Sequence, residues 1–248
     1  MSEILYLSDD KVFGPTLEGE GKYAGYPSIF MRLAMCNLTC KGFSSTDSPH
    51  GCDSFISWSK KNKFTYEELC KFMEKHGFIE ELKKDTILKL TGGEPFLQQK
   101  NLLEFIEYFI SKYKFVPRID FESNATIQPL PQWNNLGGVT YTVSPKLSNN
   151  GDPEEKRYKP EILKWFKNNN ACFKFVVKSE EDVREIFEKY INDSVINIPK
   201  ELIWFMPCCG SREEQNTQAF IVAELCKKYN IKFSPRLQLL IWNKALKV

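Results

Sequence analysis

Short runs of apolar residues recur along the chain, and most of them end in a polar segment marked by glycine or proline. The runs are residues 27–35, 86–90, 118–123, 139–144, 172–177, 202–207 and 233–242. They are rich in β-branched and aromatic residues and nearly continuously apolar, which is typical of parallel strands covered on both faces. The pattern therefore predicts seven strands.

Between these runs, apolar residues recur at the spacing of a helix. The segment 65–77 begins with Thr65 as a cap, places Leu69 and Met73 on one face and ends at Gly77. Similar patterns cover residues 102–113, 160–170, 180–190 and 217–229. Strands that alternate with helices predict an α/β protein with a parallel sheet or an open barrel, in which ligands bind at the carboxyl ends of the strands.

Composition narrows the class of protein. The 248 residues contain no internal repeat and no long linker, so we expect a single domain over residues 1–248. A net charge of +2 gives no electrostatic footprint for nucleic acid, and no window approaches the roughly 18 apolar residues that a membrane span needs. Acidic residues stand at the start, where a signal peptide has basic ones, so we expect a cytoplasmic protein. Its eight cysteines then predict free thiols or metal ligands rather than disulfides.

Four of the predicted strands run directly into segments that suit chemistry rather than packing. The first long run leads into a cysteine-rich loop at residues 36–54, and the run 86–90 leads into the sequence TGGEP. The run 118–123 continues into SNAT, and the run 139–144 continues into SPK. Because parallel strands end at the same edge of a sheet, we expect these four segments to meet there.

The loop at 36–54 carries three thiols, Cys36, Cys40 and Cys52. Clustered cysteines in a reducing compartment are typical of zinc or iron–sulfur sites. Three thiolates would leave one iron of a four-iron cluster without a protein ligand and open to a small molecule. A structural zinc ion closed by His50 as the fourth ligand is the alternative, and the loop alone leaves both possibilities open.

The TGGEP segment changes this balance. Gly92 and Gly93 let the backbone approach a ligand closely, and Glu94 adds a carboxylate. An isolated pair of glycines more often makes a tight turn before a helix. Next to a loop with three cysteines, however, the pair favours a ligand-binding site.

The ordered series of motifs resembles the radical S-adenosylmethionine superfamily and, within it, the 7-carboxy-7-deazaguanine synthases. The resemblance covers nearly the whole chain, through residues 13–40, 52–54, 91–95, 121–126, 143–146, 173–177, 205–207 and 234–242. It implies an incomplete (β/α) barrel of the radical S-adenosylmethionine type, with fewer helices than strands. The chain departs from the usual pattern in its long loop, where eleven residues separate Cys40 from Cys52 and Phe43 takes the place of a cysteine.

The resemblance also implies ligands for a [4Fe–4S] cluster, S-adenosylmethionine, Mg²⁺ and a pterin. The cluster is assigned to Cys36, Cys40 and Cys52, and S-adenosylmethionine to Gly92, Gly93, Glu94, Ser123, Asn124, Ser144 and Lys146. The pterin is assigned to Glu18, Glu20 and Arg32, and Mg²⁺ to Ser54. Three of these neighbourhoods depart from the family, which more often has Gln at 18, Thr at 54 and Gly at 125.

The activity that the resemblance implies is the conversion of 6-carboxy-5,6,7,8-tetrahydropterin to 7-carboxy-7-deazaguanine with loss of ammonia. This step belongs to 7-deazapurine (queuosine-type) biosynthesis and starts with a 5′-deoxyadenosyl radical. An electron donor such as a flavodoxin, and a homodimer, are implied with it. Two alternatives stay open: an activase of glycyl-radical enzymes, and a non-catalytic binding module stabilised by zinc.

The remaining cysteines are expected to be structural. Cys70, Cys172 and Cys226 lie within helical or strand patterns and are read as small buried hydrophobic residues. Cys208 and Cys209 follow a predicted strand at the functional edge, and a structural role is also preferred for them. Arg236 and Gln238 are placed at the end of the last strand, and the sequence leaves open whether they reach the substrate.

Overall fold

The computed structural model describes residues 3–41, 52 and 55–243. Most of the predicted loop at 36–54 therefore lies outside the described residues. The same is true of the predictions made for Phe43, His50 and Ser54.

The core of the protein is a curved sheet of nine strands in the order β3-β1-β2-β4-β5-β6-β7-β8-β9. The strands are β1 (Ile4–Leu17), β2 (Pro27–Leu33), β3 (Asn62–Thr65), β4 (Ile87–Gly92), β5 (Ile119–Ser123), β6 (Val139–Val143), β7 (Ala171–Val177), β8 (Ile203–Pro207) and β9 (Lys232–Phe233). From β2 to β9 the pairing is parallel, whereas β1 runs antiparallel to both β2 and β3. Within the described residues β3 and β9 form the two edges, so the barrel is open, as predicted.

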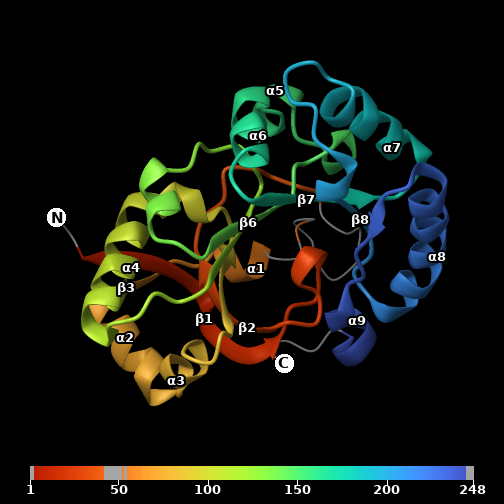
Figure 1. Ribbon diagram of the computed structural model, residues 1–248. Helices are drawn as coiled ribbons and strands as arrows, with labels where there is room; N and C mark the ends of the chain where they lie inside the picture. Colours follow the sequence, from red (N-terminus) through yellow and green to blue (C-terminus); the bar gives the residue numbers. More distant parts are fainter. Residues whose placement is uncertain (1–2, 42–51, 53–54, 244–248) are drawn as a thin grey trace.

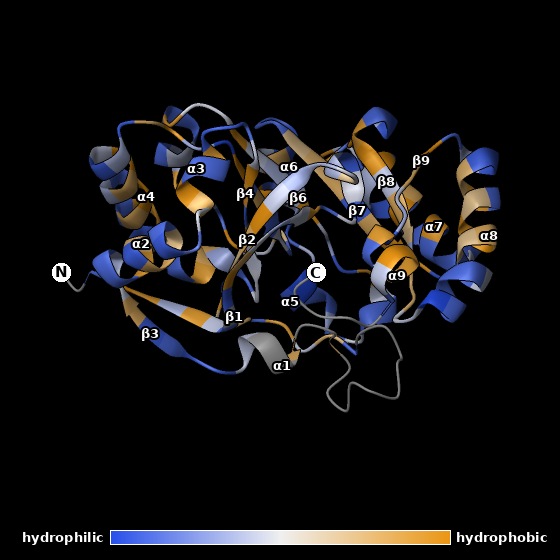
Figure 2. Ribbon diagram, turned by 90° about the horizontal axis from the view of Figure 1, so that it is seen from below, coloured by the Kyte–Doolittle hydropathy of each residue, from blue (hydrophilic) through white to orange (hydrophobic). Residues whose placement is uncertain are grey.

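The helices lie around the outside of this sheet, apart from α1, which lies in the centre of the view (Figure 1). They are α1 (Phe55–Trp58), α2 (Tyr66–Lys75), α3 (Phe78–Leu82), α4 (Gln99–Tyr113), α5 (Glu154–Arg157), α6 (Pro160–Lys167), α7 (Glu180–Ile186), α8 (Arg212–Tyr229) and α9 (Leu237–Trp242). Three of these segments have only four or five residues, so the longer helices in the described chain are fewer than the strands. Hydrophilic and hydrophobic positions alternate along the helices, as amphipathic covering elements require (Figure 2).

Alternation along the strands separates the core from the interior of the barrel. Leu90, Phe121 and Tyr141 pack in one layer, in which the ring centroids of Phe121 and Tyr141 lie 5.7 Å apart. Their neighbours Lys89 and Asp120 point to the opposite face, because successive strand residues alternate. The inner face of the sheet is therefore charged although both faces are buried.

The structure corrects the prediction of a last strand at 233–242. The strand β9 has two residues, and residues 237–242 form the helix α9. Pro235 has no N–H group with which to continue the ladder, and Leu237 N instead donates to Gly19 O at 2.9 Å. As a result α9 lies beside the loop that follows β1 (Figure 1).

Two further features were absent from the prediction. The long strand β1 was missed because glycine, proline and paired aspartates interrupt its apolar pattern. In addition, α8 starts at Arg212, five residues before the predicted start. No helix in the described ranges combines the length and hydrophobicity needed to cross a bilayer.

Candidate active site

The ends of β2 and β4 are locked together by backbone contacts. Gly93 N donates to Leu33 O at 3.0 Å, and Glu94 N donates to Met35 O at 2.8 Å. A Cβ atom on Gly93 would lie 1.8 Å from Met35 O, and one on Gly92 would lie 2.3 Å from Leu33 O. Gly92 also has a φ of +114°, which side-chain-bearing residues rarely adopt. Both glycines are therefore required by the close approach of two chain segments directly before Cys36.

Glu94 joins the end of β4 to the end of β5. Its buried carboxylate accepts hydrogen bonds from Asn124 N at 2.8 Å, Ser123 Oγ at 3.0 Å and Phe96 N at 3.1 Å. Burial raises the pKa of Glu94 to about 7, although these hydrogen bonds favour the charged form. The sequence assigned Glu94 to a cofactor, and the structure directs its carboxylate to the neighbouring loop.

The loops after β2, β5 and β6 also meet, as the sequence predicts. Asn124 Nδ2 donates to Asn37 Oδ1 at 2.9 Å, and Asn37 Nδ2 donates to Thr126 Oγ1 at 2.8 Å. Ser144 is joined to the β5 end by its N–H, which donates to the carbonyl of Ser123 at 2.7 Å. Lys146 Nζ in turn donates to Ser144 Oγ at 3.0 Å. The residues assigned to S-adenosylmethionine thus form one connected edge.

Cys36, Cys40 and Cys52 are half-buried, reduced thiols close to this edge. Burial raises the pKa of Cys36 to about 11, and the negative charges of Cys40 and Cys52 add to the rise. Cys36 is therefore within electrostatic range of both Cys40 and Cys52. Asn150 Nδ2 lies 3.1 Å from Cys40 Sγ and can donate to it.

Three thiolates suit a [4Fe–4S] cluster, in which one iron then has no protein ligand. Among the described residues, no group of three or more His, Cys, Asp or Glu side chains is arranged to hold one metal ion, and His50, the fourth ligand of the zinc alternative, lies outside them. In a four-iron cluster each thiolate binds a different iron, so the sulfurs stand further apart than around one zinc ion. Amide N–H groups that approach the sulfurs are a usual part of such sites.

The interior of the barrel below the thiols holds a buried charged network. Lys89 Nζ lies 2.6 Å from Asp120 Oδ2 and 2.9 Å from Glu18 Oε2. Lysine side chains are almost never fully buried unless they are paired, and these two carboxylates compensate the charge of Lys89. Burial raises the pKa of Glu18, and Lys89 acts in the opposite direction.

A second group of charges gathers around Glu20. Lys174 forms ion pairs with Glu20 and, at 2.6 Å, with Glu122. Arg236 Nε donates to Glu20 Oε1 at 2.8 Å, and Gln238 Nε2 donates to the same oxygen at 2.7 Å. Burial opposes the charge of Glu20, but Lys174 and Arg236 outweigh it and hold the pKa of this carboxyl below its ordinary value.

One amide oxygen in this interior, Gln238 Oε1, is buried without a hydrogen-bond donor from the described residues. A Cβ atom on Gly19 would lie 1.7 Å from Gln238 Oε1, so the missing side chain of Gly19 makes room for this amide. Buried acceptors without donors are costly, and they fit a ligand that brings N–H groups.

Arg32 belongs to the same charged interior of the barrel, which we call the chamber. In the parallel register it pairs with Thr91, whose hydroxyl donates to Glu122 Oε2 at 2.8 Å. The guanidinium group of Arg32 stacks over the ring of Phe13, 5.1 Å from its centroid. The planar edge of a guanidinium group has the shape that suits a carboxylate.

Several residues of the chamber were not identified from the sequence. They are Lys89, Asp120, Glu122 and Lys174. A signal was present, because a lysine in the middle of the apolar runs TILKL and CFKFVV predicts a paired buried charge. Arg236 and Gln238 do reach the chamber, but they come from the start of α9 rather than from a strand end.

Comparison with known proteins identifies relatives of this chain. Residues 17–127 match the family described as a 4Fe-4S single cluster domain. The 7-carboxy-7-deazaguanine synthase of Aquifex aeolicus is 30% identical over 89% of the chain and 87% of its own length. The enzyme of the same name from Methanospirillum hungatei is 33% identical over 84% of the chain and 75% of its own length.

A solved structure supports the fold alone. The crystal structure of QueE from Escherichia coli superimposes with a TM-score of 0.62 at 20% identity, over 94% of this chain and 93% of the other. At the sequence level, identity of 30% that extends over nearly the whole of both chains shows the family. The chain belongs to the 7-carboxy-7-deazaguanine synthase family of radical S-adenosylmethionine enzymes.

Proposed function

We propose that the protein converts 6-carboxy-5,6,7,8-tetrahydropterin to 7-carboxy-7-deazaguanine, with loss of ammonia, in queuosine-type biosynthesis. The names of its relatives point to this product. The observation that carries the proposal is the buried amide oxygen Gln238 Oε1, which has no donor among the described residues, beside Glu20 in a chamber of the same sheet that carries the three thiols. A pterin ring carries several N–H groups and so matches such an acceptor.

The connected edge at the ends of β2, β4, β5 and β6 would hold the cofactors. Cys36, Cys40 and Cys52 would bind a [4Fe–4S] cluster, with one iron left for S-adenosylmethionine. When bound, these two groups supply a one-electron reductive cleavage that produces a radical able to abstract hydrogen from the substrate. The residues assigned to S-adenosylmethionine by resemblance line the connected edge and are Gly92, Gly93, Glu94, Ser123, Asn124, Ser144 and Lys146.

Glu94 supports this edge rather than ending in open space. Its carboxylate accepts hydrogen bonds from Ser123 Oγ, Asn124 N and Phe96 N. The first two bonds fix the positions of Ser123 and Asn124 in the loop after β5. We infer that Glu94 holds the β4 and β5 loops at the spacing that the cofactor needs. Lys146 adds a positive charge on the far side of the same edge.

The chamber around Glu18 and Glu20 would bind the pterin through charge and hydrogen bonding. Glu20 stays ionised because Lys174 and Arg236 face it, so it offers a charged acceptor. Gln238 adds the acceptor Oε1, which has no donor among the described residues, and Glu18 adds a carboxylate paired with Lys89. The planar guanidinium group of Arg32 has the shape that suits the carboxylate of the substrate. The buried walls exclude water, which would otherwise compete for these groups.

Other parts of the proposal rest on resemblance. Mg²⁺ would bind at Ser54, which is outside the described residues, and an electron donor such as a flavodoxin would reduce the cluster. We also propose that residues 1–248 act as one domain, that the protein is cytoplasmic and that it works as a homodimer.

Anaerobic incubation with S-adenosylmethionine, a reductant, Mg²⁺ and the tetrahydropterin tests the proposal, with the products identified by mass spectrometry. We expect 7-carboxy-7-deazaguanine from protein that carries about four irons and four sulfides per chain. Glu20→Gln should lose most of this product while it keeps the same iron content. One zinc per chain without sulfide would instead support a binding module, and radical formation only on a partner protein would support an activase.

A further inference from the structure

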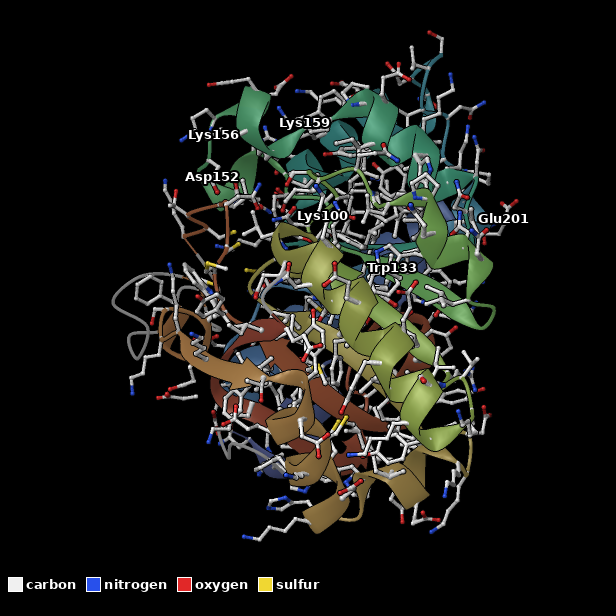
Figure 3. The ribbon with its side chains drawn as sticks, turned by 90° about the vertical axis from the view of Figure 1, so that its left-hand side faces the viewer. Lys100, Trp133, Asp152, Lys156, Lys159 and Glu201 are labelled. Atoms are coloured by element: carbon white, nitrogen blue, oxygen red, sulfur yellow. The ribbon has the colours of Figure 1, made fainter. Side chains whose placement is uncertain are left out.

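The segment after β6 that contains residues 148–152 packs directly against the loop that carries Cys36 and Cys40. Lys41 N donates to Asn150 O at 2.8 Å, and Thr39 Oγ1 donates to Asp152 Oδ1 at 2.6 Å. Thr39 N also donates to both carboxylate oxygens of Asp152, at 3.1 Å each. Figure 3 shows Asp152 beside the loop that carries the sulfur atoms. The chain on both sides of Cys40 is therefore held by this segment.

The side chain of Asn150 makes the closest of these contacts to sulfur. Its Nδ2 lies 3.1 Å from Cys40 Sγ and 2.8 Å from Asp152 Oδ2. Its Oδ1 accepts from Asp152 N at 2.8 Å, which fixes the orientation of the amide. A backbone N–H can only donate, so the oxygen must face Asp152 N and the NH₂ group must face Cys40.

The same segment is also held by contacts with Glu185 and Arg157. Ser148 N and Oγ both donate to Glu185 Oε2, at 2.8 and 2.6 Å. Arg157 is buried, donates to Lys146 O at 2.9 Å and lies 2.8 Å from Glu185. Contacts on both sides hold Asn150 in place, so its amide is presented to Cys40 without reorganisation.

We propose that Asn150 is a positioning residue that sets the reduction potential of the cluster through an N–H···S hydrogen bond to Cys40. This inference rests on the proposed function, because it requires Cys40 to be a cluster ligand. A donor to a ligating sulfur withdraws negative charge from it and stabilises the reduced cluster, which raises the potential. The contact at Cys36 is weaker, since Asn124 Nδ2 lies 4.0 Å from that sulfur and is shared with Asn37.

The variant Asn150→Leu tests the proposal, because leucine has a similar size and no donor. After anaerobic reconstitution of the full chain, the midpoint potential is measured by a redox titration followed by electron paramagnetic resonance. We expect a lower potential, with the reduction equilibrium changed roughly tenfold, which is about 59 mV for one electron. Asn149→Leu is the matched control, since the amide of Asn149 donates to Val176 O at 3.2 Å. That control should keep the potential of the parent protein.

An Asn150→Leu protein with the same iron content and the same potential as the parent would overturn the inference. If this variant does not assemble a cluster, Asn150→Asp takes its place, because it keeps the acceptor that faces Asp152 N. Asn149→Asp then controls for the added charge, and equal potentials in the two aspartate variants would also overturn the inference. Failure of the parent to bind iron would refute the proposed function instead, so the two failures are distinguishable.

Discussion

The close approach of Gly93 to Met35 gives a direct test of how the site is built. In Gly93→Ala, the new Cβ atom would lie 1.8 Å from Met35 O and 2.5 Å from Met35 C. Real Cβ contacts are essentially never below 3.0 Å, and both partners are backbone atoms that cannot rotate away. The two segments must therefore separate by about 1.2 Å, the difference between 3.0 and 1.8 Å.

This separation has an energetic cost that the structure lets us estimate. The hydrogen bond from Glu94 N to Met35 O is 2.8 Å long and would stretch to about 4.0 Å, which is too long for a hydrogen bond. Losing a buried donor and acceptor costs about 1–3 kcal/mol each, and overpacking adds about 1–3 kcal/mol. We expect the free energy of unfolding of Gly93→Ala to fall by about 3–9 kcal/mol. Cys36 follows Met35 directly, so cluster assembly should fall as well.

Urea unfolding of the protein without metal, followed by tryptophan fluorescence, measures the stability term, and iron analysis after reconstitution measures assembly. Gly137→Ala is the control, because Gly137 has a φ of +70° and a Cβ atom added there would meet no atom within 4 Å, so this variant should lose only about 1–2 kcal/mol. A Gly93→Ala protein as stable as this control, with a full set of irons, would refute the reasoning.

Three further outcomes follow from the buried groups. Lys89→Met leaves two acids unpaired and should cost about 3–5 kcal/mol in urea unfolding; adding Glu18→Gln should recover part of this loss, and no recovery would exclude the pairing. Burial raises the pKa of Glu94 to about 7, so the folded state holds a proton that the unfolded chain releases above pH 4.5. The stability of the parent relative to Glu94→Gln should therefore fall by about 3 kcal/mol as the pH rises from 4.5 to 7 and beyond, and a constant difference would contradict the shift. Gly19→Ala places a Cβ atom 1.7 Å from Gln238 Oε1, so it should raise KM for the pterin about tenfold at nearly constant kcat, and steady-state kinetics with an unchanged KM would count against a substrate contact.

The parallel strands of the fold could be predicted because each carries a complete local signal. Runs such as CFKFVV are buried on both faces, and their pattern does not depend on distant residues. The last run was misassigned because LQLLIW is apolar enough for either a strand or a helix. A distant contact favours the helix, because Leu237 N donates to Gly19 O and Pro235 ends the ladder of strand hydrogen bonds.

The same reasoning explains which site residues could be found. The cysteines and the TGGEP segment are local motifs, and the structure brings them together at one edge of the sheet. The network around Lys89 and Lys174 depends on register between strands, which a single sequence does not supply. Asn150 was missed for the same reason, because it lies 110 positions from Cys40 in the chain.

The docking of α9 against the loop after β1 has a consequence for biosynthesis of the protein. Glu20 leaves the ribosome long before Arg236 and Gln238, which contact it. During translation Glu20 would be present before two of its partners have been made. Domains generally fold as units during synthesis, so folding around Glu20 has to wait for these partners. The chamber can close only after position 238 has been made, so a nascent chain stalled before position 236 would expose its half-built interior to chaperones.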